Sequence, residues 1–126
     1  MTTIYVTDDE PVPIRVVKMT LERQGYEVES FRNGAAALER IREQQPDALI
    51  TDIEMPVMSG EELCKHIQDE FPERCFPIFV VTSLVDLAHR DWAQKMANLS
   101  FVEKPVSMRR LAAELKNALA GEPDRD

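Results

Sequence analysis

Short apolar runs alternate along the chain with longer stretches in which apolar residues recur at every third or fourth position. The short runs are typical of strands buried within a sheet, and the longer spacing is typical of helices that cover it. On this pattern we predict strands at residues 3–7, 26–31, 47–51, 78–81 and 99–102. A helix follows each of them, so the chain reads as five strand–helix units.

Capping residues and breakers mark the ends of these helices. Pro11 and Pro13 suit the first turn of a helix, and Gly25 suits its end. Asn33 is placed to cap the second helix, which must stop before Pro46. The apolar stripes expected to face the sheet are Ile14, Val17 and Leu21; Ala37, Leu38 and Ile41; Leu63, Ile67 and Phe71; Leu84, Leu87, Ala88 and Met96; and Met108, Leu111, Leu115 and Leu119.

Alternating strands and helices joined by right-handed crossovers predict an α/β fold, a three-layer doubly wound sandwich of five strand–helix units. The common order for five parallel strands is 2-1-3-4-5, the flavodoxin-like arrangement. In that order a crevice opens where the first and third strands diverge, outside the carboxyl ends of the strands. We expect residues 1–120 to form one domain and residues 121–126 to form a polar tail.

Composition and charge exclude several function classes. The 126 residues suffice for one core, and a net charge of −8 without a concentrated basic stripe argues against direct binding to nucleic acid or anionic lipid. The sequence has no signal peptide and no membrane-spanning apolar stretch, so we expect a cytoplasmic protein. Cys64 and Cys75 form no close pair with other ligand-type residues and are expected to be reduced, structural thiols.

Polar side chains follow four of the predicted strands. Asp8 and Asp9 come after the first strand, Asp52 after the third, Thr82 after the fourth and Lys104 after the fifth. Because such sheets gather their functional groups outside the carboxyl ends of the strands, these side chains are expected to form one site. A lone Asp-Asp pair is usually a solvated turn or a helix cap, and Thr82 alone suits a cap, so it is the ordered set that favours a site.

The three carboxylates define the chemistry of this site. At separations of roughly 5 Å they repel by about 3 kcal/mol per pair at an effective dielectric constant near 20, so a cation or a proton must bind. Oxygen-only ligands favour a hard ion such as Mg²⁺, which leaves coordination positions for a phosphate oxygen. Lys104 could form a salt bridge with the carboxylates or provide the counter-charge for an incoming anion. The Thr82 hydroxyl, a second donor, favours the interpretation as an anion site. These groups around Asp52 are those that stabilise phosphoryl transfer to a carboxylate.

The ordered motifs closely resemble those of the receiver domain of bacterial two-component response regulators, in particular single-domain regulators of the chemotaxis type. The resemblance covers essentially the whole chain. Each motif is weak alone, whereas the set in this order is specific. The motifs are Asp8-Asp9, Leu49-Ile50-Thr51-Asp52 followed by Met55-Pro56 and Met58-x-Gly60, Val80-Val81-Thr82-Ser83, and Lys104-Pro105.

This resemblance implies a phosphoacceptor and a metal site. Asp52 is the residue that matches the phosphoacceptor of the family. Asp8, Asp9 and Asp52 match the carboxylates that hold Mg²⁺ or Mn²⁺, together with the backbone carbonyl of Glu54.

The resemblance also implies a switch. Thr82 and Lys104 match the residues that contact the phosphoryl group, and the Lys104–Pro105 peptide bond is expected to be cis. On phosphorylation Thr82 moves toward the phosphoryl oxygens and Phe101 turns inward to fill the vacated space. Because Phe101 lacks a tyrosine hydroxyl, its contribution comes through packing alone. The face formed by the fourth helix, the fifth strand and the fifth helix changes accordingly.

The favoured function is a phosphorylation-dependent signalling switch that receives a phosphoryl group from a histidine kinase or a phosphotransfer protein. Its output goes to an unidentified target protein, and the same face suits a phosphorylation-dependent homodimer. One alternative is the receiver segment of a larger regulator or hybrid kinase, with Gly121 to Asp126 as the start of a linker. The other is a metal-dependent phosphohydrolase, which is disfavoured because Glu54 is a poor second acid and no substrate cap is present. We therefore expect a self-phosphorylating and autodephosphorylating receiver and not a conventional turnover enzyme.

Overall fold

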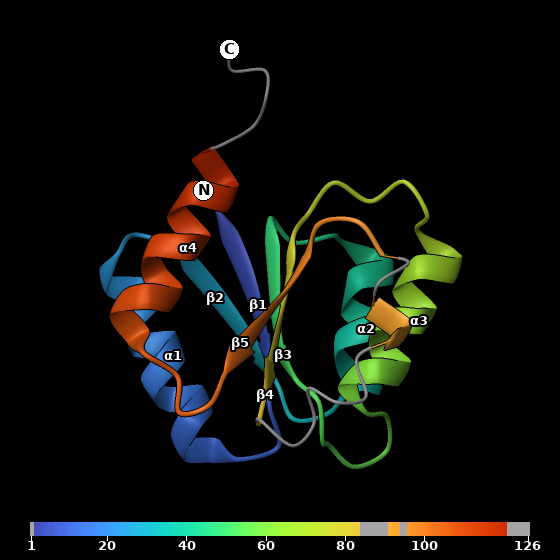
Figure 1. Ribbon diagram of the computed structural model, residues 1–126, viewed down its shortest axis with the longest axis horizontal. Coiled ribbons are helices and arrows are strands. Elements are labelled where there is room, and N and C mark those ends of the chain that lie inside the picture. Colours follow the sequence, from blue (N-terminus) through green and yellow to red (C-terminus); the bar gives the residue numbers. More distant parts are fainter. Residues whose placement is uncertain (1, 84–90, 94–95, 121–126) are drawn as a thin grey trace.

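The fold is built on a five-stranded parallel sheet. The computed structural model describes residues 2–83, 91–93 and 96–120. All neighbouring strands run parallel, and the predicted strand order is confirmed. The strands are β1 (Thr3–Thr7), β2 (Glu27–Phe31), β3 (Ala48–Asp52), β4 (Ile78–Thr82) and β5 (Leu99–Glu103), in the order β2-β1-β3-β4-β5 (Figure 1).

Four helices of the described residues cover the two faces of this sheet. α1 (Pro11–Arg23) and α4 (Met108–Ala120) lie on one face, and α2 (Gly34–Glu43) and α3 (Gly60–Glu70) lie on the other (Figure 1). The structure is the doubly wound three-layer sandwich expected from the sequence. No described helix combines the length and the apolar character needed for a membrane crossing.

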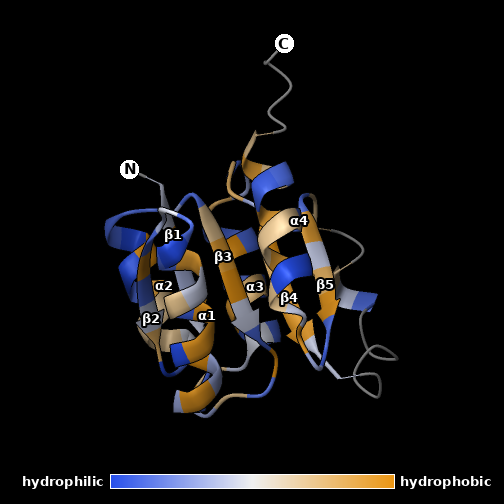
Figure 2. Ribbon diagram, turned by 90° about the vertical axis from the view of Figure 1, so that its left-hand side faces the viewer, coloured by the Kyte–Doolittle hydropathy of each residue, from blue (hydrophilic) through white to orange (hydrophobic). Residues whose placement is uncertain are grey.

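Alternating side chains along the strands build a separate core on each face of the sheet. Tyr5, Leu49 and Val80 belong to the core on the α2/α3 face, whereas Val6 and Ile50 belong to the core on the α1/α4 face. β3 and β4 are buried at every position, which explains their near-continuous apolar runs. Figure 2 shows hydrophobic colours along the central strands, while the helices carry both colours.

The predicted ends of the first two helices are confirmed. α1 ends in a Schellman motif at Gly25, whose φ of 98° favours glycine, and the Tyr26 amide donates to the Leu21 carbonyl at 3.2 Å. Asn33 caps α2, because its side chain accepts the Ala36 amide at 2.9 Å. The connections on both sides of β2 are therefore fixed by local hydrogen bonds.

Several strand ends differ from the expectation by one residue. β2 begins at Glu27 because the amide of Tyr26 is used in the end of α1. β3 extends to Asp52, which pairs with Val81 of β4. β4 and β5 each extend by one residue, because Thr82 pairs with Glu103. Asp52 and Thr82 are thus the final residues of their strands and not loop residues.

The predicted fourth helix, with Leu84, Leu87 and Ala88, lies largely outside the described residues, as does the polar tail 121–126. Met96, which was assigned to the same helix, is buried.

Both cysteines are free thiols, as expected. Cys64 is buried on α3, and this burial raises the pKa of its thiol to about 12. Cys75 is exposed.

Thr7 and Thr51 are paired neighbours on β1 and β3, and both are buried. The Thr51 hydroxyl donates to the Asp52 backbone carbonyl at 2.9 Å, whereas the Thr7 hydroxyl has no hydrogen-bond partner within the described part of the chain. An unpaired buried hydroxyl is costly, so we expect Thr7→Val to raise the free energy of unfolding by about 1 kcal/mol. The matched Thr51→Val removes a bonded hydroxyl and is expected to lower it. Urea unfolding measures both, and a loss of stability in Thr7→Val would contradict the first expectation.

Candidate functional site

Three aspartate side chains meet at the carboxyl edge of the sheet. Asp8 and Asp9 follow β1, and Asp52 ends the neighbouring strand β3. One carboxylate oxygen of each residue lies within 4.8 Å of those of the other two. Asp52 is only 6% exposed, whereas Asp8 and Asp9 are partly open to solvent. The acidic cluster expected from the sequence is therefore present.

Backbone contacts fix the Asp8-Asp9 turn against β2. The Asp8 amide donates to the Phe31 carbonyl at 3.1 Å, and Oδ1 of Asp8 accepts the Glu10 amide at 3.0 Å. The Arg32 guanidinium donates to the Asp9 carbonyl at 3.2 Å. These bonds hold the turn through its backbone and through one oxygen of Asp8, which leaves the other carboxylate oxygens available as ligands.

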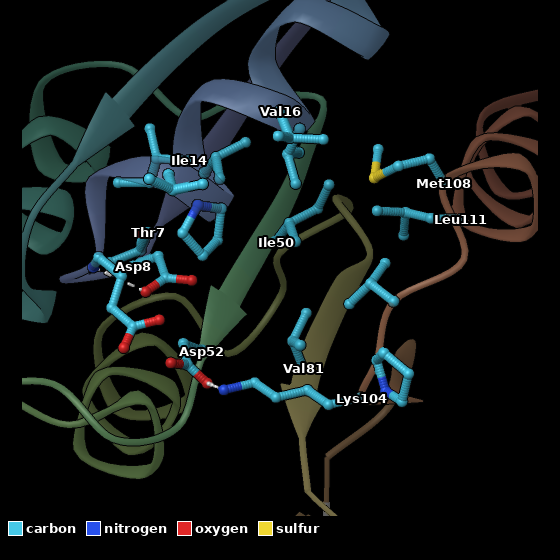
Figure 3. Close-up of a pocket in the computed structure, with 17 residues that line it drawn as sticks. Thr7, Asp8, Ile14, Val16, Ile50, Asp52, Val81, Lys104, Met108 and Leu111 are labelled. Carbon is cyan, nitrogen blue, oxygen red and sulfur yellow. Dashed lines mark hydrogen bonds and ion pairs between the residues drawn. The ribbon is translucent and has the colours of Figure 1, made fainter.

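Asp52 makes its contacts through one of its two carboxylate oxygens. Oδ1 accepts the Ile53 backbone amide at 2.9 Å and forms an ion pair with Nζ of Lys104 at 3.1 Å (Figure 3). Both contacts are made through Oδ1, and no hydrogen bond from the described residues to Oδ2 is present. The carboxylate is thus oriented through Oδ1, while Oδ2 is available to a ligand or an electrophile.

A glycine allows the chain after β3 to pack against the backbone of Asp52. The Gly60 amide donates to the Ile53 carbonyl at 2.7 Å, and a Cβ at Gly60 would overlap the Asp52 carbonyl oxygen. Ser59 and Glu62 form a capping box that starts α3 at this point. The Met58-x-Gly60 motif therefore positions α3 and the loop that surrounds Asp52.

Lys104 reaches the cluster from the end of β5. Its backbone amide donates to the Thr82 carbonyl at 2.9 Å, and the Lys104–Pro105 peptide bond is cis, the expected isomer. Burial lowers the pKa of the Lys104 ammonium, but the hydrogen bond and charge of Asp52 and the charge of Asp8 outweigh burial and raise this pKa overall. Lys104 is therefore a fixed positive charge beside the carboxylates.

Thr82 is the last residue of β4, the strand next to β3. It is buried, and its hydroxyl donates to the Ser83 backbone carbonyl at 3.2 Å. Strand alternation places Thr82 on the α2/α3 face, which also carries Val80 and Phe101. Glu54 is exposed in the loop after β3. The structure thus brings the side chains of Asp8, Asp9, Asp52 and Lys104 together, whereas Thr82 is linked to them through its backbone carbonyl, which accepts the Lys104 amide.

Comparison with known proteins decides the family. The family model for the response regulator receiver domain matches residues 4–116. The chain belongs to this family. Receiver domains are signalling modules and not conventional enzymes, and the two-component function class expected from the sequence is confirmed.

Individual relatives agree with this assignment. The receiver is 28% identical over 116 residues to the polar-differentiation response regulator DivK of Brucella anthropi, covering 92% of this chain and 94% of that protein. It is 30% identical, with a TM-score of 0.86, to the signal receiver domain of a signal transduction histidine kinase from Syntrophus aciditrophicus, covering 96% of this chain and 92% of that one. It is 27% identical, with a TM-score of 0.84, to the chemotaxis response regulator CheY4 of Vibrio cholerae, covering 94% and 99%.

An apolar groove of about 570 Å³ opens beside the acidic cluster, between α1 and α4 of the receiver. Asp8, Asp52 and Lys104 line it at the sheet edge (Figure 3). Its apolar lining includes Val12, Val16, Ile50, Val81, Val106, Met108 and Leu111.

Sequence reasoning missed an exposed apolar stripe along α1, on the side of the helix that borders this groove. Val12, Val16 and Met19 are 64%, 46% and 47% exposed, and their spacing places them on one side of the helix. The signal was present, because these residues lie off the stripe of Ile14, Val17 and Leu21 that faces the sheet.

The pH dependence of stability tests the burial of Asp8. Burial raises the pKa of the Asp8 carboxyl; the Glu10 amide lowers it in part, and the charge of Asp52 adds to the rise. The folded receiver therefore retains a proton that the unfolded chain has already released, so stability falls as the pH rises from 3.8, the ordinary aspartate value, through the raised pKa. We expect Asp8→Asn to stabilise the metal-free receiver at pH 7, with a smaller gain near pH 3.8.

Chemical denaturation in EDTA at the two pH values measures this difference. Asp69→Asn on the exposed side of α3 is the matched control and is expected to change little. Equal stability of Asp8→Asn and the wild type at pH 7 would contradict the account.

Proposed function

We propose that Asp52 accepts the phosphoryl group and that its phosphorylation switches this receiver between two signalling states. The observation that carries the proposal is that the contacts of the Asp52 carboxylate use only one of its two oxygens. Oδ1 is held by Ile53 and Lys104, Oδ2 accepts no hydrogen bond from the described residues, and two further carboxylates lie within 4.8 Å. A nucleophilic oxygen is therefore presented beside a cation site and a fixed positive charge.

Asp8, Asp9 and Asp52 are proposed to hold Mg²⁺ or Mn²⁺, together with the backbone carbonyl of Glu54. Three carboxylates form the oxygen-only donor set that such hard ions prefer. When bound, the ion would offset most of the negative charge of these carboxylates and offer a coordination position to a phosphoryl oxygen. Their mutual repulsion favours the bound state.

The side chains of the receiver carry the transfer itself. Oδ2 of Asp52 attacks phosphorus, the bond from phosphorus to the donor breaks, and its electron pair stays on the donor. With a phosphohistidine donor, the leaving atom is an imidazole nitrogen. Lys104 then pairs with a phosphoryl oxygen, and the Thr82 hydroxyl turns from the Ser83 carbonyl toward another. The product is an aspartyl phosphate, which the receiver later loses to water.

The readout is proposed to run through Thr82 and Phe101, which lie on the same face of the sheet. The added phosphoryl charge of about −1.5 to −2 shifts an equilibrium between two arrangements of this face. The altered surface includes the edge strand β5 and α4, and it binds a target protein or a second phosphorylated receiver. The similarity to a receiver from a histidine kinase supports a place within a larger regulator as the alternative setting for the same chemistry.

The phosphodonor is proposed to be a histidine kinase or a phosphotransfer protein that docks on the exposed apolar residues of α1. A donor histidine must come within bonding distance of Asp52 Oδ2, so its protein must cover the rim of the acidic cluster. The exposed stripe of Val12, Val16 and Met19 continues from this rim along α1. It provides apolar surface for a helix of the donor.

Phosphorylation by a small donor tests the acceptor. With Mg²⁺ and phosphoramidate or acetyl phosphate, we expect intact mass spectrometry to detect one phosphoryl adduct on the wild type and none on Asp52→Asn. The exposed Asp69→Asn carries the same chemical change away from the site and is expected to label as the wild type does. An adduct on Asp52→Asn, or none on the wild type, would refute the assignment of the acceptor.

A comparison of donors tests the docking surface. In the double variant Val12→Ser and Val16→Ser, we expect phosphotransfer from a histidine-phosphorylated protein that labels the wild type to slow by about tenfold, because apolar burial is lost. Labelling by acetyl phosphate needs no docking and is expected to keep its rate. If both donors slow equally, the substitutions act on the chemistry at Asp52, and the proposed docking surface is contradicted.

A further inference from the structure

Two aromatic side chains meet on the sheet face that carries Thr82. Val80 pairs with Phe101 and Thr82 pairs with Glu103, so Thr82, Val80 and Phe101 all project toward the α2/α3 face. The ring of Trp92 packs edge-on against Phe101, with ring centroids 6.0 Å apart and an interplanar angle of 71°. Trp92 comes from the connection between β4 and β5, which begins directly after Thr82.

Both rings are packed against the same core. Trp92 and Phe101 are half-buried, and each contacts the hydrophobic cluster that includes Val80 and Met96. Protein interiors are close-packed, so a ring in such a cluster does not change its position without changing its contacts. A movement of Phe101 therefore alters its edge-on contact with Trp92.

We propose that Trp92 is a positioning residue of the phosphorylation switch, which couples the position of the Phe101 ring to the short turn at residues 91–93. This inference rests on the proposed function of Asp52, Thr82 and Phe101. Trp92 is not a member of the acidic cluster, and it acts through its contact with Phe101. The alternative is an aromatic pair that stabilises both signalling states equally.

Thermodynamic linkage distinguishes a positioning role of Trp92 from an aromatic pair that stabilises both signalling states equally. If the contact between Trp92 and Phe101 differs between the states, removal of the indole changes the affinity for a phosphoryl analogue bound at Asp52, because coupling between two sites is reciprocal. If the contact is the same in both states, the stability of the fold changes but the affinity does not.

The experiment measures the binding of beryllofluoride in the presence of Mg²⁺ by fluorine NMR. We expect Trp92→Leu to change the dissociation constant by about fivefold or more, and Trp92→Phe, which keeps an aromatic ring, to stay within about twofold of the wild type. Phe71→Leu is the matched control, because Phe71 packs against the same cluster from the end of α3. An unchanged dissociation constant in Trp92→Leu, or an equal change in Phe71→Leu, overturns the proposal.

Fluorescence provides the second readout, since Trp92 is the single tryptophan of the chain. We expect beryllofluoride to change the Trp92 emission of the wild type, and we expect Phe101→Leu to reduce this change while fluorine NMR still detects the bound analogue. If beryllofluoride binds but the emission of the wild type does not change, the role of Trp92 is overturned and the proposed function is not. No bound analogue and no phosphoryl adduct on the wild type overturns the proposed function, and this inference with it.

Discussion

Mutual repulsion among three carboxylates at one edge of the sheet is the constraint on which the rest of the site depends. The strand order places β1 beside β3, so Asp8, Asp9 and Asp52 cannot avoid one another, and at 4.8 Å each pair repels by about 3 kcal/mol at an effective dielectric constant of 20. Lys104 offsets the charge of Asp52 through an ion pair at 3.1 Å, and the raised pKa of Asp8 reflects its burial and the charge that remains. The fold therefore holds these carboxylates in mutual repulsion, and a cation that binds to them relieves this repulsion.

The two faces of the sheet give this edge two different surroundings. The α1/α4 face carries the apolar groove and the exposed stripe of α1, which suit contact with a protein that delivers the phosphoryl group. The α2/α3 face carries Thr82, Phe101 and Trp92, which suit the readout. Because β4 and β5 contribute alternate residues to both faces, an event at the edge reaches both without any change in strand order.

Sequence predicted the architecture well because the relevant signals are local. Apolar runs located all five strands, and Gly25 and Asn33 marked helix ends by backbone conformation and capping. The edge of the site was also predictable, since Asp8, Asp9, Asp52 and Lys104 each lie at the carboxyl end of a strand. Contacts between segments that are distant in the sequence were not predictable. The choice of Oδ1 for the Lys104 ion pair, the packing of Gly60 on the Asp52 backbone and the pairing of Trp92 with Phe101 depend on how elements meet in space, and no local pattern encodes them.

The dependence of labelling on Mg²⁺ tests the central claim most directly. The wild-type receiver is incubated with phosphoramidate over a range of Mg²⁺ concentrations, and the modified peptide is located by mass spectrometry. If the acidic cluster and Asp52 form one site, the rate saturates with Mg²⁺ at the concentration at which Mg²⁺ binds, and all of the label lies on Asp52. Labelling at the same rate without a divalent ion, or label on another residue, would contradict this account.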